Sequence, residues 1–167
     1  MATIKGLHHN AYRCRDSEET RKFYEDFLGL PLDIAFELEA SLTGRPIRAL
    51  HSFYRMADNS FLAFFEVPDM AFEFSNQHDF DLHIALEVEM DELHAMFEKA
   101  KAEGREVRGI SDHHFVHSVY FRDPNGYVVE LTARTDIADS YEKDAKAEAH
   151  DALAKWQATK PAAQYAA

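Results

Sequence analysis

The sequence repeats one pattern twice, and a histidine in a short apolar segment begins each copy. His9 begins the first copy and His83 the second. In each copy an acidic residue suited to cap a helix follows, then apolar residues at helical spacing, then a glycine suited to end the helix. His9 precedes its glycine, Gly29, by 20 residues, and His83 precedes Gly104 by 21. The histidine, the helix cap, the apolar helical pattern and the terminating glycine recur in the same order and at nearly the same spacing. The chain is therefore predicted to contain two copies of one structural unit.

Each copy is expected to form one strand, one helix and then three more strands. Asp16 and Asp91 are the expected helix caps. The segment 123–126, which reads DPNG, predicts a tight hairpin turn between the last two strands. The expected strands lie near residues 5–14, 32–40, 47–56 and 60–67 in the first copy, and near 81–89, 105–110, 116–122 and 126–133 in the second.

The composition changes after Arg134 to one rich in Ala, Lys, Glu and Asp. Residues 139–158 predict an amphipathic helix that docks on the domain or on a partner subunit, because Tyr141, Leu153 and Trp156 belong to a narrow apolar stripe. We therefore expect an α+β fold with a domain over residues 1–134, made of modules 4–67 and 81–133, and a C-terminal helical tail over residues 135–167.

Composition disfavours several classes of function. The chain has 167 residues and a formal net charge of −12, whereas phosphate neutralisation in nucleic-acid binding needs clustered Lys and Arg. The sequence opens without a charged and apolar leader, and no apolar run approaches the roughly 20 residues of a membrane helix. A single cysteine, Cys14, excludes an internal disulfide and fits a reducing compartment. We expect a soluble, cytoplasmic protein without nucleic-acid or membrane partners.

Two histidines and two glutamates are the candidate metal ligands. His9 and His83 begin matching strands, and Glu66 and Glu130 lie in the apolar strands that end the two copies. A carboxylate flanked by Val and Leu, as Glu130 is, is costly to bury unless a metal or a charged partner compensates. Two imidazoles and two carboxylates on opposing modules therefore predict a metal site with open coordination positions.

Four segments resemble the vicinal oxygen chelate superfamily, which includes glyoxalase I, fosfomycin-resistance proteins, methylmalonyl-CoA epimerase and extradiol ring-cleaving dioxygenases. The resemblance covers about residues 4–134. It implies that the two βαβββ modules form a curved eight-stranded cup, usually in a homodimer. It also implies a divalent metal ion (Ni, Zn, Co, Mn or Fe(II)) on the inner face and a small-molecule substrate rich in oxygen. The matching segments are 7–12 (LHHNAY), 23–29 (FYEDFLG), 81–86 (DLHIAL) and 120–131 (YFRDPNGYVVEL).

The number of metal ligands decides which reaction is expected. If His9, His83, Glu66 and Glu130 all bind, two positions of an octahedral ion remain for neighbouring oxygens of one substrate. A carboxylate, Glu66 or Glu130, can then remove a proton from carbon while the metal holds the enediolate, and this glyoxalase-like lyase or isomerase is the leading expectation. If Glu66 does not bind, three open positions suit a catecholate and dioxygen on Fe(II), as in extradiol dioxygenases. A metal-free binding protein of the bleomycin-resistance type and nucleophile transfer to an epoxide are further alternatives.

Three other residues bear on this choice. Arg13 shares a strand face with His9, while His8 is expected to point the other way, because side chains alternate along a strand. In glyoxalase I the arginine four residues after the histidine-equivalent ligand binds a carboxylate of glutathione. Arg13 lies four residues after His9, so it is a candidate substrate-binding residue. Dioxygenases place a catalytic histidine and a hydrogen-bonding tyrosine near His113 and Tyr120, which are candidate catalytic residues. The structural alternatives are a rim salt bridge for Arg13, a solvated loop position for His113 and sheet packing for Tyr120.

Overall fold

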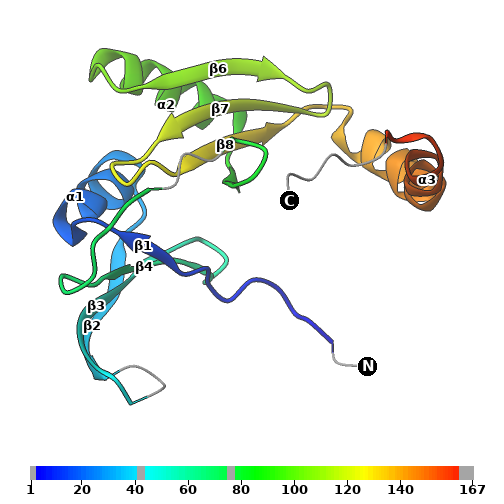
Figure 1. Ribbon diagram of the computed structural model, residues 1–167. Helices are drawn as coiled ribbons and strands as arrows, with labels where there is room; N and C mark the ends of the chain where they lie inside the picture. Colours follow the sequence, from blue (N-terminus) through cyan, green and yellow to red (C-terminus); the bar gives the residue numbers. More distant parts are fainter. Residues whose placement is uncertain (1–2, 41–43, 75–77, 162–167) are drawn as a thin grey trace.

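The computed structural model of the chain contains eight strands, divided equally between two sheets (Figure 1). It describes residues 3–40, 44–74 and 78–161. In spatial order the first sheet consists of β1 (Tyr12–Cys14), β4 (Phe61–Glu66), β3 (Pro46–Arg55) and β2 (Leu32–Ala40). The second consists of β5 (His83–Glu87), β8 (Val128–Arg134), β7 (Val116–Arg122) and β6 (Val107–Asp112). In both sheets the first pair is parallel and the other pairs are antiparallel, which confirms the α+β fold of two βαβββ modules.

The first strand is shorter than the predicted 5–14. Residues 3–11 contain no regular strand, and an isolated parallel bridge between His9 and Phe61 continues the pairing towards the N-terminus. The Asn10 side chain holds this segment to β4, because its Oδ1 accepts a hydrogen bond from the Ala63 amide at 3.1 Å. Strand alternation therefore does not fix the directions of side chains before Tyr12.

The predicted helix of each module forms, and the second of these two helices begins at a different residue from the prediction. In α1 (Ser17–Arg21) the Asp16 carboxylate caps the first turn by accepting from the Glu19 amide at 2.8 Å, as expected. The chain continues as a π-helical turn, η1 (Lys22–Phe27). The second helix, α2 (Met90–Ala102), is capped by Glu89 and not by Asp91, which lies in its first turn. Glu89 is the last extended residue before the helix, so it occupies the capping position.

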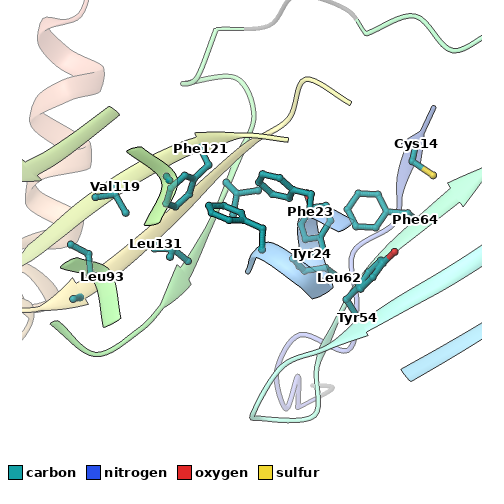
Figure 2. Packing of buried hydrophobic residues seen from close by; sticks show 14 residues of the cluster. Cys14, Phe23, Tyr24, Tyr54, Leu62, Phe64, Leu93, Val119, Phe121 and Leu131 are labelled. Atoms are coloured by element: carbon teal, nitrogen blue, oxygen red, sulfur yellow. The ribbon is translucent and has the colours of Figure 1, made fainter. Parts of the chain in front are cut away.

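The helical segments pack between the two sheets and share one core with both. Figure 2 shows Phe23 and Tyr24 between the side chains of the first sheet and those of the second. The Tyr24 ring lies 4.7 Å from that of Phe64 on β4, and the Phe27 ring lies 5.4 Å from that of Phe121 on β7. One face of each sheet is therefore covered by the shared core, and the opposite face of each sheet points away from it.

The predicted hairpin turn at 123–126 also fastens the two modules together. The buried Asp123 carboxylate accepts a hydrogen bond from the Tyr24 hydroxyl at 3.0 Å. Asn125 accepts from the Arg15 amide at 2.8 Å and donates to the Thr20 hydroxyl at 3.2 Å. Burial raises the pKa of both Tyr24 and Asp123, so the phenol stays a hydrogen-bond donor in this network.

The C-terminal helix α3 (Ala138–Thr159) extends to one side of the second sheet (Figure 1). Its base is held by stacking of Tyr141 on Phe115, with centroids 4.5 Å apart, and by ion pairs from Arg134 to Asp139 and Glu142. Leu153 and Trp156, which lie further along the apolar stripe, are exposed. None of the helices in the described ranges is long and apolar enough to cross a membrane.

Candidate metal centre

His83 and Glu130 form a preorganised pair on the outer face of the second sheet. Ala85 is the partner of Glu130 in the ladder between β5 and β8, so His83, Ala85 and Glu130 share one face. His83 Nε2 lies 3.4 Å from Glu130 Oε2. His83 Nδ1 lies 2.6 Å from the carbonyl oxygen of Asp79, and because a carbonyl only accepts, Nδ1 is the donor. In the neutral ring Nε2 then carries the lone pair that a metal ion needs.

The surroundings of this pair fit a bound cation. Glu130 is only 8% exposed, and His83 is its one ion-pair partner among the described residues. In the neutral form of His83, Nε2 and the carboxylate oxygen are both electron-pair donors, and both can bind one cation. Two ligands that each lie roughly 2.1 Å from one ion at a right angle are about 3 Å apart, which is close to the observed separation. The backbone carbonyl behind His83 orients the imidazole as such partners commonly do for metal-bound histidines.

Tyr120 and His113 lie beside this pair. Tyr120 is the ladder partner of Glu130 across β7 and β8, so both side chains lie on the same face. The Tyr120 hydroxyl is 3.0 Å from His113 Nε2, and the Arg108 guanidinium lies over the phenol ring at 4.8 Å. Burial and the nearby Glu130 charge raise the pKa of Tyr120, which keeps its hydroxyl protonated.

His9 lies on the first sheet, apart from the His83 and Glu130 pair. It is exposed, and its ring lies near those of Phe53 and His51, at 5.5 and 6.3 Å between centroids. His8 was expected to point away from His9, but the two Nδ1 atoms are 2.8 Å apart. The expectation fails because the chain is not a regular strand at these residues. Within the described ranges no three His, Cys, Asp or Glu side chains of one chain are close enough to hold a metal ion.

The structure places Glu66 on the core face of β4, opposite to the face of His9. Its ladder partners are Cys14 and Leu50, and its Oε2 accepts a hydrogen bond from the Ser17 amide at 2.8 Å, at the start of α1. Phe65 occupies the face of His9 instead, where it stacks on His51. Glu66 therefore lies on a different face from the other predicted ligand of this sheet, and it stabilises the first turn of α1.

The register explains why the two glutamates are not equivalent. In the second sheet His83 pairs with Val128, and Glu130 lies two residues further along β8. In the first sheet His9 pairs with Phe61, so the matching position on β4 is Ala63. Glu66 lies three residues beyond Ala63, and an odd offset along a strand turns a side chain to the other face.

Replacing Glu66 by alanine should lower stability and leave metal binding unchanged. The variant loses the acceptor for the Ser17 amide, so we expect a loss of about 0.5–2 kcal/mol in the free energy of unfolding, as for other lost helix caps. Urea unfolding measures the loss, with Glu148→Ala on the exposed part of α3 as the control. Elemental analysis should find the same metal content as in the parent protein, and a clear drop would return Glu66 to the ligand set.

Arg13 lies on the same face as His9, as predicted, because its ladder partner is Phe65. Its Nη2 donates to the carbonyl oxygen of Met70 at 3.0 Å and to that of Val67 at 3.5 Å. These bonds tie the guanidinium to the turn after β4. A role of Arg13 in substrate binding stays a prediction.

His51 was missed by the sequence reasoning, although it is the most enclosed histidine of the predicted binding face. It is 6% exposed and lies on β3 between the rings of Phe36, Phe53 and Phe65. The sequence signal for His51 is a single polar ring in a strand whose neighbours on the same face are apolar.

The fold and the paired donors define a class of protein with two βαβββ modules and a metal-compatible histidine and carboxylate on a sheet face. The model of the Glyoxalase/Bleomycin resistance protein/Dioxygenase superfamily matches residues 6–131. The chain belongs to this superfamily, whose members include enzymes and binding proteins. No curated protein is a significant match to the chain.

Several solved structures share the fold. An integron cassette protein from the mobile metagenome of Halifax Harbour is 25% identical, with a TM-score of 0.54 over 78% of this chain and 99% of that one. FosX from Listeria monocytogenes, a fosfomycin resistance protein crystallised as a variant with Mn(II) and dihydroxypropylphosphonic acid, is 22% identical, with a TM-score of 0.59 over 80% and 96% of the two chains. A glyoxalase/bleomycin resistance protein/dioxygenase domain from Frankia is 15% identical, with a TM-score of 0.64 over 80% and 95%.

Proposed function

We propose that the protein is a homodimeric enzyme dependent on a divalent metal, and that each site is completed by the partner subunit. His9 and the His83 and Glu130 pair lie on faces that point away from the core between the two sheets. They therefore do not meet within one chain. In a twofold dimer the first sheet of one subunit can lie over the second sheet of the other, and symmetry then creates two equivalent sites.

The ligands in this arrangement are His83, Glu130 and the partner subunit's His9. This is a set of two histidines and one carboxylate, which is typical of Fe(II) enzymes that keep coordination positions open. A bound ion with open positions would supply a site for two neighbouring oxygens of a substrate and for dioxygen. The FosX structure with Mn(II) is consistent with the use of divalent metals by relatives of this fold.

The reaction best supported is ring cleavage of a catechol by an extradiol-type dioxygenase. The observation that carries this proposal is that Glu66 lies on the core face and caps α1, which leaves three ligands and not four. The same observation removes Glu66 from the two carboxylates, Glu66 and Glu130, that a glyoxalase-like lyase or isomerase was expected to use as proton acceptor. The aromatic surface around His51, made of Phe36, Phe53 and Phe65, is also suited to a flat ring.

Tyr120 and His113 supply proton transfer and hydrogen bonding in this proposal. The Tyr120 hydroxyl is protonated and lies on the face of Glu130, so it can donate to a substrate oxygen held near the metal. His113 Nε2 is within hydrogen-bond distance of that hydroxyl and can exchange a proton through it. Their separation of 3.0 Å is in the range needed for direct transfer.

Oxygen uptake with substituted catechols, after anaerobic loading with Fe(II), tests this function. We expect ring-cleavage products from the parent protein and a loss of roughly 10² to 10⁴ in turnover for His113→Ala, as for a lost acid or base. The control is His114→Asn, because His114 has a φ of 71° that asparagine tolerates, and in the described residues the histidine that bonds the Tyr120 hydroxyl is His113. Turnover of 2-oxoaldehyde hemithioacetals with Ni or Zn, without oxygen uptake on catechols, would instead establish the lyase or isomerase.

A further inference from the structure

We propose that Asp79 is a positioning residue for the metal-binding imidazole of His83. Arg108 and Arg122 hold the carboxylate of Asp79, and the backbone carbonyl of the same residue accepts a hydrogen bond from His83 Nδ1. The inference rests on the proposed function for the role of His83 as a ligand. It adds a residue of the segment between β4 and β5, which acts on the site through His83.

The carbonyl that orients His83 belongs to a turn and not to a strand. Residues 78–82 lie outside the regular strands, and the Asp81 amide donates to the carbonyl oxygen of His78 at 2.7 Å. The Asp79 carbonyl oxygen lies within this turn, 2.6 Å from His83 Nδ1. Because no strand ladder fixes the turn, the orientation of the imidazole depends on the side-chain contacts that hold it.

The Asp79 carboxylate is held at two points by the second sheet. Arg108 on β6 places its Nη2 2.6 Å from Asp79 Oδ2, and Arg122 at the end of β7 places its Nη2 3.5 Å from Oδ1. Arg122 is itself fastened, because its Nη1 donates to the carbonyl oxygen of Gly126 at 2.8 Å. A single exposed ion pair contributes little, but the Asp79 side chain is only 22% exposed and its two oxygens bind different arginines. These contacts together restrict the turn.

The two arginines lie on the binding face of the second sheet. The ladder partner of Arg108 is Tyr120, and that of Arg122 is Val128, so both side chains share the face of Glu130. β5 and β6 are the opposite edges of this sheet. The ion pairs of Asp79 therefore connect the edge that carries the metal-binding histidine to the other side of the sheet, across the face where the ion is proposed to bind.

The orientation of the His83 ring decides whether a lone pair points to the site. With Nδ1 donating to the Asp79 carbonyl, the neutral ring presents the lone pair of Nε2, which lies 3.4 Å from Glu130 Oε2. A ring without this partner can rotate or carry its proton on Nε2, and either change removes a ligand. Loss of a group that orients a metal-bound histidine typically lowers metal affinity by about 10- to 100-fold.

Titration of the metal-free protein with Mn(II) measures the effect of these contacts. Asp79→Ala should weaken binding by roughly tenfold. Arg108→Ala separates positioning from simple charge, because removal of a cation near the site would by itself tighten Mn(II) binding, whereas release of the turn weakens it. We expect weaker binding, and a double variant that binds no more weakly than Asp79→Ala. Glu106→Gln is the matched control and should bind as the parent, since Glu106 pairs with Arg122 at 3.5 Å.

The position of the proton on the His83 ring is a readout that a merely structural role would not move. A long-range ¹H–¹⁵N spectrum of the metal-free protein at about pH 9, where imidazoles are generally neutral, shows which ring nitrogen carries the proton. Comparison with His83→Ala identifies the signals. We expect protonated Nδ1 in the parent and a mixture of both forms in Asp79→Ala. Asp79→Asn should restore the parent form, because its amide oxygen accepts from Arg108 without the charge.

The outcomes separate this inference from the proposed reaction. A folded Asp79→Ala with the parent spectrum would overturn the inference, whether or not its Mn(II) affinity falls, and so would tighter Mn(II) binding by Arg108→Ala. A displaced ring proton and weaker Mn(II) binding in Asp79→Ala, in a protein that takes up no oxygen with catechols, would reject the dioxygenase and leave the inference standing.

Discussion

Replacing His83 by alanine is expected to weaken metal binding by more than about 100-fold, because even residues that only orient a ligand change metal affinity by about 10- to 100-fold. His83 and Glu130 are the one close pair of a histidine and a glutamate on the proposed binding face of the described chain. Loss of His83 leaves Glu130 as a nearly buried carboxylate with no ion-pair partner in that part of the chain. Glu130→Ala should have the same effect.

Elemental analysis after anaerobic purification, and titration of the metal-free protein with Fe(II), Mn(II) and Ni(II), measure this loss. His117→Ala is the matched control, since His117 lies on β7 of the same sheet and makes its ion pair with Asp112, away from Glu130. The fold should survive in His83→Ala, because the ring belongs to the face opposite the core. Full metal occupancy in that variant would contradict the assignment.

Mixing two inactive variants is expected to restore metal sites if the site is shared between subunits. His9→Ala and His83→Ala should each bind little metal alone. In a mixed dimer, the intact His9 of one chain meets the intact His83 and Glu130 of the other, so one site of the two is complete. Random pairing of equal amounts makes half of the dimers mixed, and the expected metal content is about a quarter of that of the parent protein.

This experiment requires chains that exchange, so the two variants are unfolded and refolded together, and the control is refolding of each variant alone. A particle of twice 19.2 kDa by light scattering is expected for all of them. Recovery of no metal in the mixture, from folded dimers, would mean that each site is built within one chain. A monomeric particle would reject the shared site altogether.

The proposal of a shared site follows from the packing of the helical segments between the two sheets. Tyr24 and Phe27 occupy the space between the sheets, and their contacts with Phe64 and Phe121 give both modules one core. The same packing that stabilises the chain turns the two histidine-bearing faces outward. In the proposed dimer, a second copy supplies the third ligand for the pair on the second sheet.

The second sheet could be predicted closely from the sequence. The ladders of β8 with β5 and with β7 have no register shift, so alternation correctly placed His83 and Glu130 on one face, with Tyr120 beside them. The helices and the hairpin at 123–126 followed from local signals, which act over a few residues and do not depend on the rest of the chain.

The first sheet could not be predicted in the same detail, because its site depends on register and on partners far along the chain. Whether Glu66 faces His9 depends on an offset of one residue between strands, which a repeat in the sequence does not define. The directions of His8 and His9 depend on an irregular segment held by the side chain of Asn10. The sequence by itself determined two copies of one fold and the placement of His83 and Glu130 on one face of regular strands. The tertiary structure decided that the copies pack through their helices, that Glu66 caps α1 and that His51 lies among aromatic rings, because these depend on contacts between residues distant in the sequence.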